Sequence, residues 1–489
     1  FRDSLRAFLQ KEVVPNIDQW EEDRRIPRYV WQKMGEQGFL GLGYPEKYGG
    51  SELDFFFDVV FAEETSKVFS GGFAVTQSVT QYMSTSYILK HGTEQLKQKY
   101  LPGVVAGQLI SSIGITEPSA GSDSANIKTT AILEGDHYVV NGSKTFITNA
   151  VYGDFIVTVV KTDPKAGPAG VSLLVIDRNA EGVSATKLKK LGWHASDTAE
   201  LAFDSVKVPK ENLIGEEGQG FYYLMGGLQL ERLIGAVGAY AGSESAMEYT
   251  LKYMSERQAF GRPINKFQVL RHRMAQLATE IESCKQFTLY CCRLHNDNHY
   301  AVKECSMAKL LATELSDKVM TQCLQMFGGY GYMEEFKIAR LFRDSRILTI
   351  GGGSSEIMRE IIAKMTIDDV SYRAADQDEM VNSLPPKNNG EMKVASIMGE
   401  IRERATAADA LGSTLKFDFG EEYLYIDGSG DQNKVSAENK EADCLVETSF
   451  ADFLALTKGE LNPMSAVMTG KLKIKGNMGV AMKLQSLFG

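Results

Sequence analysis

The chain has 489 residues, of which 43% are hydrophobic and 24% charged, and this is the composition of a soluble globular protein with several domains. Its formal net charge of -10 argues against a nucleic-acid partner, because nucleic-acid-binding surfaces are basic. No apolar run reaches the ~20 residues that cross a bilayer. The chain begins with Phe1 rather than Met, so we expect the natural N-terminus, and any targeting peptide, to be missing.

The six cysteines and six histidines lack the spacing of a disulfide framework or a metal site. No cysteines form a CxxC pair, and five of the six fall in one region with helical periodicity. His295 and His299 have i,i+4 spacing, but Asp297 would point away from their face of a helix. We therefore expect reduced cysteines and no metal.

The N-terminal half of the chain changes from helical to strand patterns. Residues 1–110 have the periodicity of amphipathic helices, beginning with Phe1 to Leu9, and predict an all-α domain. Residues 111–217 contain short β-branched runs such as Phe155-Ile-Val-Thr-Val-Val, separated by turn signals such as Asn141-Gly142. The second region therefore predicts an antiparallel sheet or small barrel.

Long helical patterns return in residues 218–370, where we expect four helices, at Gly220–Arg257, Phe267–Asn296, Ala301–Phe327 and Ser354–Ile367. A polar stretch at 371–389, with Pro385-Pro386, predicts a linker. Residues 390–489 form a different unit, with an expected helix around 394–408 followed by alternating strands. This last unit is predicted to be α+β.

Two glycine- and hydroxyl-rich segments are candidates for binding a cofactor. Neither a Rossmann G-x-G-x-x-G fingerprint nor a P-loop is present. The segment from Ile113 to Asp123 brings hydroxyls and backbone amides into a tight turn, which suits a flavin ring and phosphates, although a plain loop has the same composition. Gly351-Gly352-Gly353 precedes a helix that Ser354 or Ser355 can cap, so its free amides either bind an anion or carbonyl or form only a structural cap.

Glu231 begins a stripe of glycines along one face of a predicted helix. Gly235, Gly238 and Gly242 follow it at +4, +7 and +11, and each interior glycine costs roughly 0.5–1 kcal/mol relative to alanine. Two explanations remain open: another helix packs closely against the stripe, or an extended apolar ligand lies along it beneath the carboxylate.

In their order along the chain, the motifs resemble those of the acyl-CoA dehydrogenase family over about residues 1–367. The resemblance implies a helical N-terminal domain, a β-barrel or sheet middle domain and a four-helix-bundle C-terminal domain. It rests on Thr116-Glu-Pro-Ser-Ala-Gly-Ser-Asp123, Asn141-Gly-Ser-Lys-Thr-Phe-Ile-Thr-Asn149, Glu256-Arg-Gln-Ala-Phe-Gly-Arg262, Gln325-Met-Phe-Gly-Gly-Tyr-Gly331 and Arg343-Asp344.

The same resemblance implies FAD as cofactor and an acyl-CoA thioester as substrate. It places Gln325 to Gly329 across a subunit boundary, with Arg257 and Gln268 on the adenine dinucleotide part of FAD. The implied FAD-binding residues are Ile113, Thr116, Ser122, Phe146, Ile147, Thr148, Arg257, Phe260, Gln268, Gln325, Phe327, Gly328, Gly329, Ser354, Ser355 and Glu356, and the implied substrate-binding residues are Ser122, Gln229, Arg232 and Gly353.

The sequence departs from most of this family at the catalytic glutamate. The family's usual position, in the Gly-rich motif, is occupied here by Gly352. The long-chain and isovaleryl branches instead carry the glutamate on the preceding helix, at the position of Glu231. We therefore expect Glu231 to remove the α-proton, while the Gly352 N–H polarises the thioester carbonyl.

The C-terminal unit resembles the sterol carrier protein 2 domain, which implies a sheet covered by helices around a lipid tunnel. The match is clearest at Asp443, Phe450 to Ala466 and Gly470 to Leu484. Candidate tunnel-lining residues, some of which must be ordinary core, are Phe453, Leu456, Met464, Met468, Leu472, Met478 and Met482.

The two resemblances together imply an oxidoreductase acting on the CH–CH bond of long acyl-CoAs, as in fatty acid β-oxidation. Its expected partners are an electron-transferring flavoprotein and further copies of the chain in a homotetramer. The alternatives are an oxidase that passes electrons to oxygen and an inert acyl-CoA- or lipid-binding protein. The dehydrogenase part implies the mitochondrial matrix and the carrier part the peroxisome, although the chain ends without an S-K-L signal.

Overall fold

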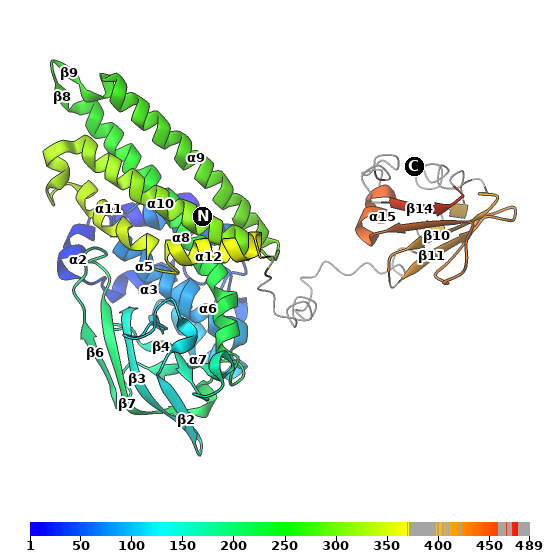
Figure 1. The fold of residues 1–489 in the computed structure, drawn as a ribbon, viewed down its shortest axis with the longest axis horizontal. Coiled ribbons are helices and arrows are strands. Elements are labelled where there is room, and N and C mark those ends of the chain that lie inside the picture. The colour runs from blue at the N-terminus through cyan, green and yellow to red at the C-terminus, as the bar shows by residue number, and fades with distance from the viewer. Residues whose placement is uncertain are drawn as a thin grey trace. The chain divides into compact units, whose positions relative to one another are not determined.

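The computed structural model describes residues 1–368, 370, 398, 401–402, 405–406, 408, 410–420, 422–457, 466 and 472–477. The chain divides into two compact units, Phe1–Ala374 and Ala375–Gly489, each with its own hydrophobic core (Figure 1). The linker expected at 371–389 lies outside the described residues. No helix in the described part of the chain is long and apolar enough to cross a membrane.

Helices form the first part of the larger unit. Three of them begin at a side-chain cap, because Asp54, Ser70 and Thr93 each accept a hydrogen bond from a backbone amide in the first turn. Two segments are π-helical, and the second joins two α-helices without a break. In chain order the elements are α1 (Arg2–Phe8), η1 (Leu9–Val13), α2 (Ile17–Asp23), α3 (Arg28–Glu36), α4 (Phe55–Ser66), α5 (Gly71–Ser78), η3 (Val79–Ser84), α6 (Thr85–His91) and α7 (Glu94–Val105).

A seven-stranded sheet follows, in the order β1-β4-β2-β3-β7-β6 with β5 paired to β4. Most strand pairs are antiparallel, as expected, but β4 pairs in parallel with β1 and, at one residue pair, with β2. The β2–β3 hairpin lies between β1 and β4 in the chain and supplies the long connection that a parallel pair needs. The strands are β1 (Ser111–Gly114), β2 (Thr130–Glu134), β3 (His137–Thr148), β4 (Phe155–Lys161), β5 (Val171–Asp177), β6 (Val183–Lys187) and β7 (Thr198–Pro209).

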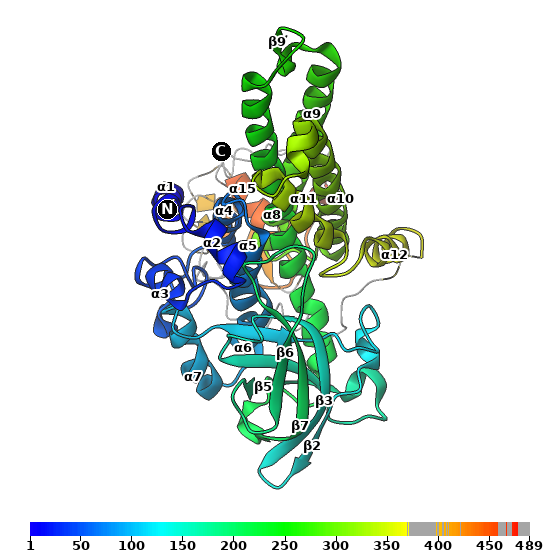
Figure 2. The same cartoon turned by 90° about the vertical axis from the view of Figure 1, so that its left-hand side faces the viewer.

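Long helices complete the unit and extend away from the sheet (Figures 1 and 2). The sequence pattern predicted four of these helices and overlooked α11, which is only nine residues long. A short hairpin of β8 (Gln258–Ala259) and β9 (Arg262–Pro263) joins the first two helices. The helices are α8 (Gly220–Glu256), α9 (Gln268–Asn296), α10 (Val302–Phe327), α11 (Lys337–Ser345) and α12 (Ser355–Thr366).

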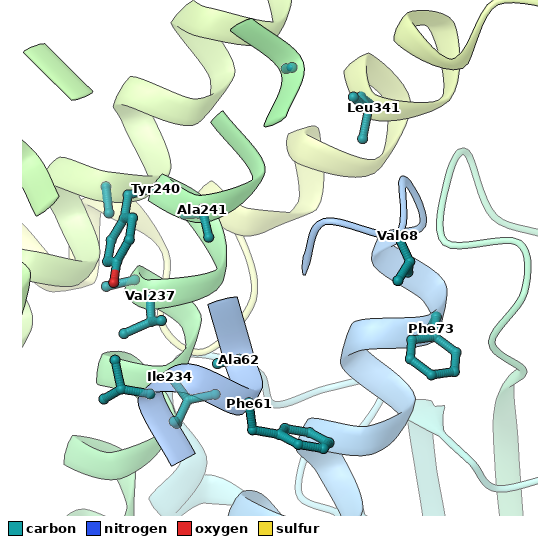
Figure 3. Packing of buried hydrophobic residues seen from close by; sticks show 14 of the residues in the cluster. Phe61, Ala62, Val68, Phe73, Ile234, Val237, Tyr240, Ala241 and Leu341 are labelled. Atoms are coloured by element: carbon teal, nitrogen blue, oxygen red, sulfur yellow. The ribbon is translucent and has the colours of Figure 1, made fainter. Parts of the chain in front are cut away.

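The helix α8 is the central packing element of this unit. Figure 3 shows Ile234 and Val237 of α8 beside Phe61 and Ala62 of α4, and all four side chains are buried in one apolar cluster. Another part of α8 packs against α10, and its N-terminal turns run past α6. The long axis of α8 therefore connects the sheet end of the unit with the β8–β9 hairpin at its other end (Figure 1).

The smaller unit has a five-stranded sheet in the order β12-β11-β10-β13-β14. In the expected helix at 394–408, the described residues Met398, Ile401, Arg402, Ala405 and Thr406 are helical, and Ala408 lies in a bend. The other elements are β10 (Thr414–Asp418), β11 (Tyr423–Asp427), β12 (Lys434–Ser436), β13 (Cys444–Thr448), α15 (Phe450–Thr457) and β14 (Leu472–Gly476).

Candidate active site

Glu231 lies about three turns after the start of α8 with its carboxylate turned into the protein. The residue is 8% exposed, and the Tyr87 hydroxyl donates a hydrogen bond to its Oε1 at 3.0 Å. Burial raises the pKa of Glu231 to about 7, against smaller lowering effects of Tyr87 and the Arg232 guanidinium. A carboxylate with this pKa changes its protonation state near neutral pH, which suits a general base.

The glycines that follow Glu231 differ in what they face. A Cβ atom at Gly235 would meet no atom within 4 Å, whereas one at Gly238 would lie 3.1 Å from Ser66 Oγ and one at Gly242 would lie 3.9 Å from a methyl carbon of Met320. Close packing therefore explains Gly238, whereas a Cβ at Gly242 would make only an ordinary contact. Close packing does not explain Gly235, one turn after Glu231, where there is open space.

The Gly-rich loop before α12 has a backbone that favours glycine. Gly352 and Gly353 have φ of +65° and +96°, and a Cβ at Gly352 would meet nothing within 4 Å. Ser354 caps α12, while the buried Ser355 hydroxyl has no hydrogen-bond partner among the described residues. The buried Lys309 of α10 donates to the Gly353 carbonyl, and this bond fixes the loop against the helix bundle.

The end of β1 and the bulged middle of β3 form a second group of candidate residues. The Thr145 amide donates to the Thr116 carbonyl at 2.8 Å, and the pairing of β3 with β7 is interrupted between Lys144 and Ile147. At this interruption Phe146 has a φ of +62° and remains 69% exposed. Ile113 and Thr148 are half-buried in the same sheet, Ile147 is buried, and Ser122 is exposed in the loop after β1.

These groups are compatible with a flavin. The exposed ring of Phe146 offers an aromatic face, and the unpartnered, buried Ser355 hydroxyl offers a polar contact. Open space lies beside Gly121 and Gly352, where backbone amides can be approached closely. The residues that the sequence associates with FAD therefore fit such a group at these positions.

The other candidate residues for FAD form a separate cluster near the β8–β9 hairpin. The Arg257 guanidinium lies 5.5 Å from the Tyr330 ring, and Phe327 stacks on Tyr253 at 4.1 Å. Phe260 is 95% exposed, and Gln268 lines a hollow of about 510 Å³ with residues of α9 and α10. Gln325, Gly328 and Gly329 are exposed at the end of α10.

The length of α8 separates this cluster from Glu231. Position 257 follows position 231 by 26 residues at the end of the same helix, and a rise of 1.5 Å per residue separates them by about 39 Å. We expected only Gln325 to Gly329 to act across a subunit boundary. Arg257, Phe260 and Gln268 lie just beyond the end of α8, in the β8–β9 hairpin and at the start of α9.

The remaining candidates for substrate, cofactor and lipid binding differ in burial and in the unit that contains them. Arg232 is buried and its guanidinium donates to Ser306 Oγ at 3.4 Å, while Gln229 is half-buried and Glu356 is exposed. In the smaller unit, Phe453, Leu456 and Leu472 belong to the packed core, which is the ordinary role allowed for some of these residues. Met464, Met468, Met478 and Met482 lie outside the described residues.

Two residues around this site were not recognised from the sequence. Tyr87 and Lys309 contact the site only through the tertiary fold. A clue existed for Tyr87, because Gly227 precedes Glu231 by one turn and extends the glycine stripe backwards. A Cβ atom at Gly227 would lie 2.6 Å from ring carbons of Tyr87.

Family models match four successive stretches of the chain. They are the acyl-CoA dehydrogenase N-terminal domain at residues 1–108, its middle domain at 112–206, its C-terminal domain at 218–367 and the SCP-2 sterol transfer family at 397–489. The three dehydrogenase models follow the order of helices, sheet and helices in the larger unit.

Individual proteins are similar over the same region. The mouse (Mus musculus) mitochondrial long-chain specific acyl-CoA dehydrogenase is 39% identical over 374 residues, which are 76% of this chain and 86% of the mouse protein. A short-chain specific acyl-CoA dehydrogenase of Clostridium acetobutylicum is also 39% identical, over 74% of this chain and 96% of its own. The crystal structure of an acyl-CoA dehydrogenase from Geobacillus kaustophilus superposes with a TM-score of 0.73, at 46% identity over 75% of this chain and 97% of that one.

Proposed function

The chain belongs to the acyl-CoA dehydrogenase family, with an SCP-2 domain at its C-terminus, and from this premise we propose that it oxidises acyl-CoA thioesters to trans-2-enoyl-CoA with Glu231 as the catalytic base. The observation that carries the proposal is the buried carboxylate of Glu231 beside the open space at Gly235. An acyl chain in that space would present its α-carbon near the carboxylate.

The cofactor is FAD, which when bound supplies the two-electron acceptor for the hydride that leaves the β-carbon. We assign its ring to the surface formed by Phe146 to Thr148, the loop from Ile113 to Ser122, and Ser354 to Glu356. The exposed face of Phe146 and the unpartnered Ser355 hydroxyl support this assignment.

The residues of this chain carry out the proton transfer. Glu231 accepts the α-proton of the thioester, and its pKa of about 7, raised by burial, leaves enough carboxylate at neutral pH for this step. We assign the Gly352 amide to the thioester carbonyl, where a hydrogen bond would stabilise the negative charge that develops on the oxygen. A glutamate at position 352 is unnecessary when position 231 provides the base.

Glu231→Gln tests the assignment, because the amide keeps the shape of the side chain but cannot accept the proton. We expect the variant to bind FAD and acyl-CoA normally and to reduce its flavin at least ~10²-fold more slowly, which is the low end of general-base contributions. Anaerobic stopped-flow absorbance of the flavin measures this rate. Glu63→Gln, which changes another buried glutamate beside α8, is the matched control. Wild-type flavin reduction in Glu231→Gln would refute the proposed base.

We further propose a preference for long acyl chains. The open space beside Gly235 supports this preference, since it lies one turn beyond the base and borders the helix along which a chain would extend. Sequence identity does not decide the matter, because long-chain and short-chain relatives are equally identical to this chain. A lipid-binding role for the C-terminal unit would suit poorly soluble substrates.

The assembly and electron acceptor complete the proposal. The separation of about 39 Å between Glu231 and Arg257 favours an FAD site built from at least two subunits, as in the homotetramer that the resemblance implies. We propose an electron-transferring flavoprotein as acceptor and the mitochondrial matrix as location. Peroxide formation without an acceptor protein would instead indicate the oxidase alternative.

A further inference from the structure

The hydrogen bond between Tyr87 and Glu231 connects two helices at the base of the candidate site. Tyr87 is 1% exposed on α6, and its hydroxyl lies 3.0 Å from Glu231 Oε1. In the described part of the chain, no other hydrogen bond to the Glu231 side chain is present. The phenol therefore holds one carboxylate oxygen and leaves Oε2 available for another contact.

The helix α8 provides the space that the phenol occupies. Gly227 lies one turn before Glu231, and any Cβ at this position would lie 2.6 Å from ring carbons of Tyr87. An interior glycine costs roughly 0.5–1 kcal/mol relative to alanine, so its presence here needs a structural reason. At Gly227 that reason is the tyrosine, whereas Gly235, on the other side of Glu231, faces open space.

The helix that carries Tyr87 is offset by the preceding π-helical segment, η3. A π-turn inserts an extra residue and rotates the side chains that follow it. Hydroxyls stabilise this wide turn: Ser84 Oγ donates to the Val79 carbonyl at 2.8 Å, and Thr85 Oγ1 donates to the Thr80 carbonyl. Tyr87 follows the end of η3 by three residues, so the direction of its side chain depends on this stabilised π-helical turn.

The chemistry of the pair suits control of a base by a neighbouring donor. Burial and the nearby Glu231 carboxylate raise the pKa of Tyr87 further above its ordinary value, so the phenol keeps its proton and donates it in a hydrogen bond. Donation to the charged carboxylate stabilises the ionised form and fixes the rotation of the carboxylate group.

We propose that Tyr87 is a positioning residue, which holds the Glu231 carboxylate in the orientation for proton abstraction. Gly227 and the η3 turn are the structural features that allow it. This inference rests on the proposed role of Glu231 and adds a second residue to it. Tyr87 takes no part in bond making or breaking.

Tyr87→Phe in the full-length, FAD-containing protein is the first test. Loss of the phenol removes a stabilising contact with the ionised carboxylate, so the midpoint of the pH profile for flavin reduction should rise by about one pH unit. We expect the maximal rate to fall about 10-fold while the acyl-CoA concentration at half-maximal rate changes less than about 2-fold, because the base is misplaced but the pocket is kept. Stopped-flow reduction between pH 5.5 and 9 measures all three quantities.

Tyr240→Phe is the matched control, because this buried tyrosine of α8, which Figure 3 labels, also donates a hydrogen bond to a buried glutamate, Glu63, at 2.6 Å. Loss of the Tyr240 hydroxyl should leave the midpoint of the pH profile for flavin reduction unchanged. Gly227→Ala retains the phenol but displaces it, and should shift the midpoint in the same direction as Tyr87→Phe. It also provides the test if Tyr87→Phe yields no flavoprotein.

The outcomes separate this inference from the proposed function. The inference is overturned if Tyr87→Phe keeps the wild-type midpoint and rate. It is also overturned if Tyr87→Phe and Gly227→Ala lose flavin content but keep the wild-type midpoint, because Tyr87 would then serve only in packing. If Glu231→Gln is inactive at the same time, the proposed base still stands. Full flavin reduction by Glu231→Gln would instead refute the proposed base, and the positioning role with it.

Discussion

At the scale of single residues, burial of the Glu231 carboxylate lowers the stability of the fold but provides the catalytic base. Burial raises the pKa of Glu231 to about 7, so the folded protein binds a proton at this residue more tightly than the unfolded chain does. Stability therefore falls as the pH rises from about 4.5 to about 7, because folding must then bury a charge. The same property provides a base near neutral pH.

Glu231→Gln should remove this pH-dependent cost. We compare the free energy of unfolding of the variant with that of wild type at each pH. From pH 5 to pH 8 this difference should change by about 1–3 kcal/mol in favour of the variant, since the amide carries no charge at either pH. Denaturant unfolding of the FAD-containing proteins at both pH values measures the difference.

Glu64→Gln is the control for this comparison. Burial alone would raise the pKa of Glu64, but hydrogen bonds from Arg6 and Arg2 lower it to about 2. That carboxylate stabilises the fold above about pH 4.5 and loses its contribution only as the pH falls toward 2. Its replacement should therefore destabilise the protein equally at pH 5 and pH 8. A flat difference for Glu231→Gln as well would show that the pKa of Glu231 is not raised in the folded protein, because its carboxylate would then be ionised already at pH 5.

At the scale of elements, the sequence predicts long, periodic helices better than contacts between them. The expected helix Gly220–Arg257 corresponds to α8, which ends at Glu256, because a continuous apolar pattern determines it. The short helix α11, the π-helical turns and the parallel pairing of β1 with β4 depend on tertiary packing and were not predicted. Tyr87 was overlooked for the same reason, since it lies 144 residues from its partner.

The glycine stripe shows where a local pattern becomes ambiguous. Helix packing and a ligand groove both favour residues without side chains, so spacing alone left both explanations open. The structure divides the stripe: a Cβ would be tight at Gly238, make an ordinary contact at Gly242 and meet open space at Gly235. Of the three positions, Gly235 alone borders space that a ligand could fill.

Substitutions at Gly235 test that explanation. Gly235→Ala should stabilise the protein by about 0.5–1 kcal/mol, because alanine favours the helix and its methyl group meets no neighbour. Gly235→Leu should fold and bind FAD, yet reduce kcat/KM for long acyl-CoAs at least 10-fold more than for short ones, because its side chain fills the proposed path. Thermal unfolding and steady-state kinetics across a series of chain lengths measure these effects.

Gly242→Ala, farther along the same face, is the control for the helix backbone, since its methyl group would make only ordinary contact with Met320. It should stabilise the helix without changing the chain-length profile. If Gly235→Leu leaves that profile unchanged, the space beside Gly235 is not the path of the acyl chain.

At the scale of the whole molecule, the two units have separate cores, and their proposed roles differ accordingly. The larger unit contains Glu231, the Gly-rich loop and every residue assigned to FAD, and the smaller unit matches a sterol transfer family. The packed rings of Phe417, Phe419 and Phe453 stabilise the smaller unit from within, independently of the dehydrogenase fold. Catalysis and lipid handling should therefore be separable by cutting the chain between the units.

A chain truncated after Ala374 should bind FAD and oxidise short acyl-CoAs at the full-length rate, because it keeps every residue of the proposed site. If the smaller unit delivers poorly soluble substrates, the truncated chain should lose activity on long acyl-CoAs several-fold. Residues 375–489 added as a separate chain should restore this activity only in part, since the covalent link raises the effective concentration of the carrier. Kinetics at several substrate lengths measure both effects. Equal loss at every length would indicate a structural role for the smaller unit, and no loss would exclude delivery, because long acyl-CoAs would then reach the space beside Gly235 unaided.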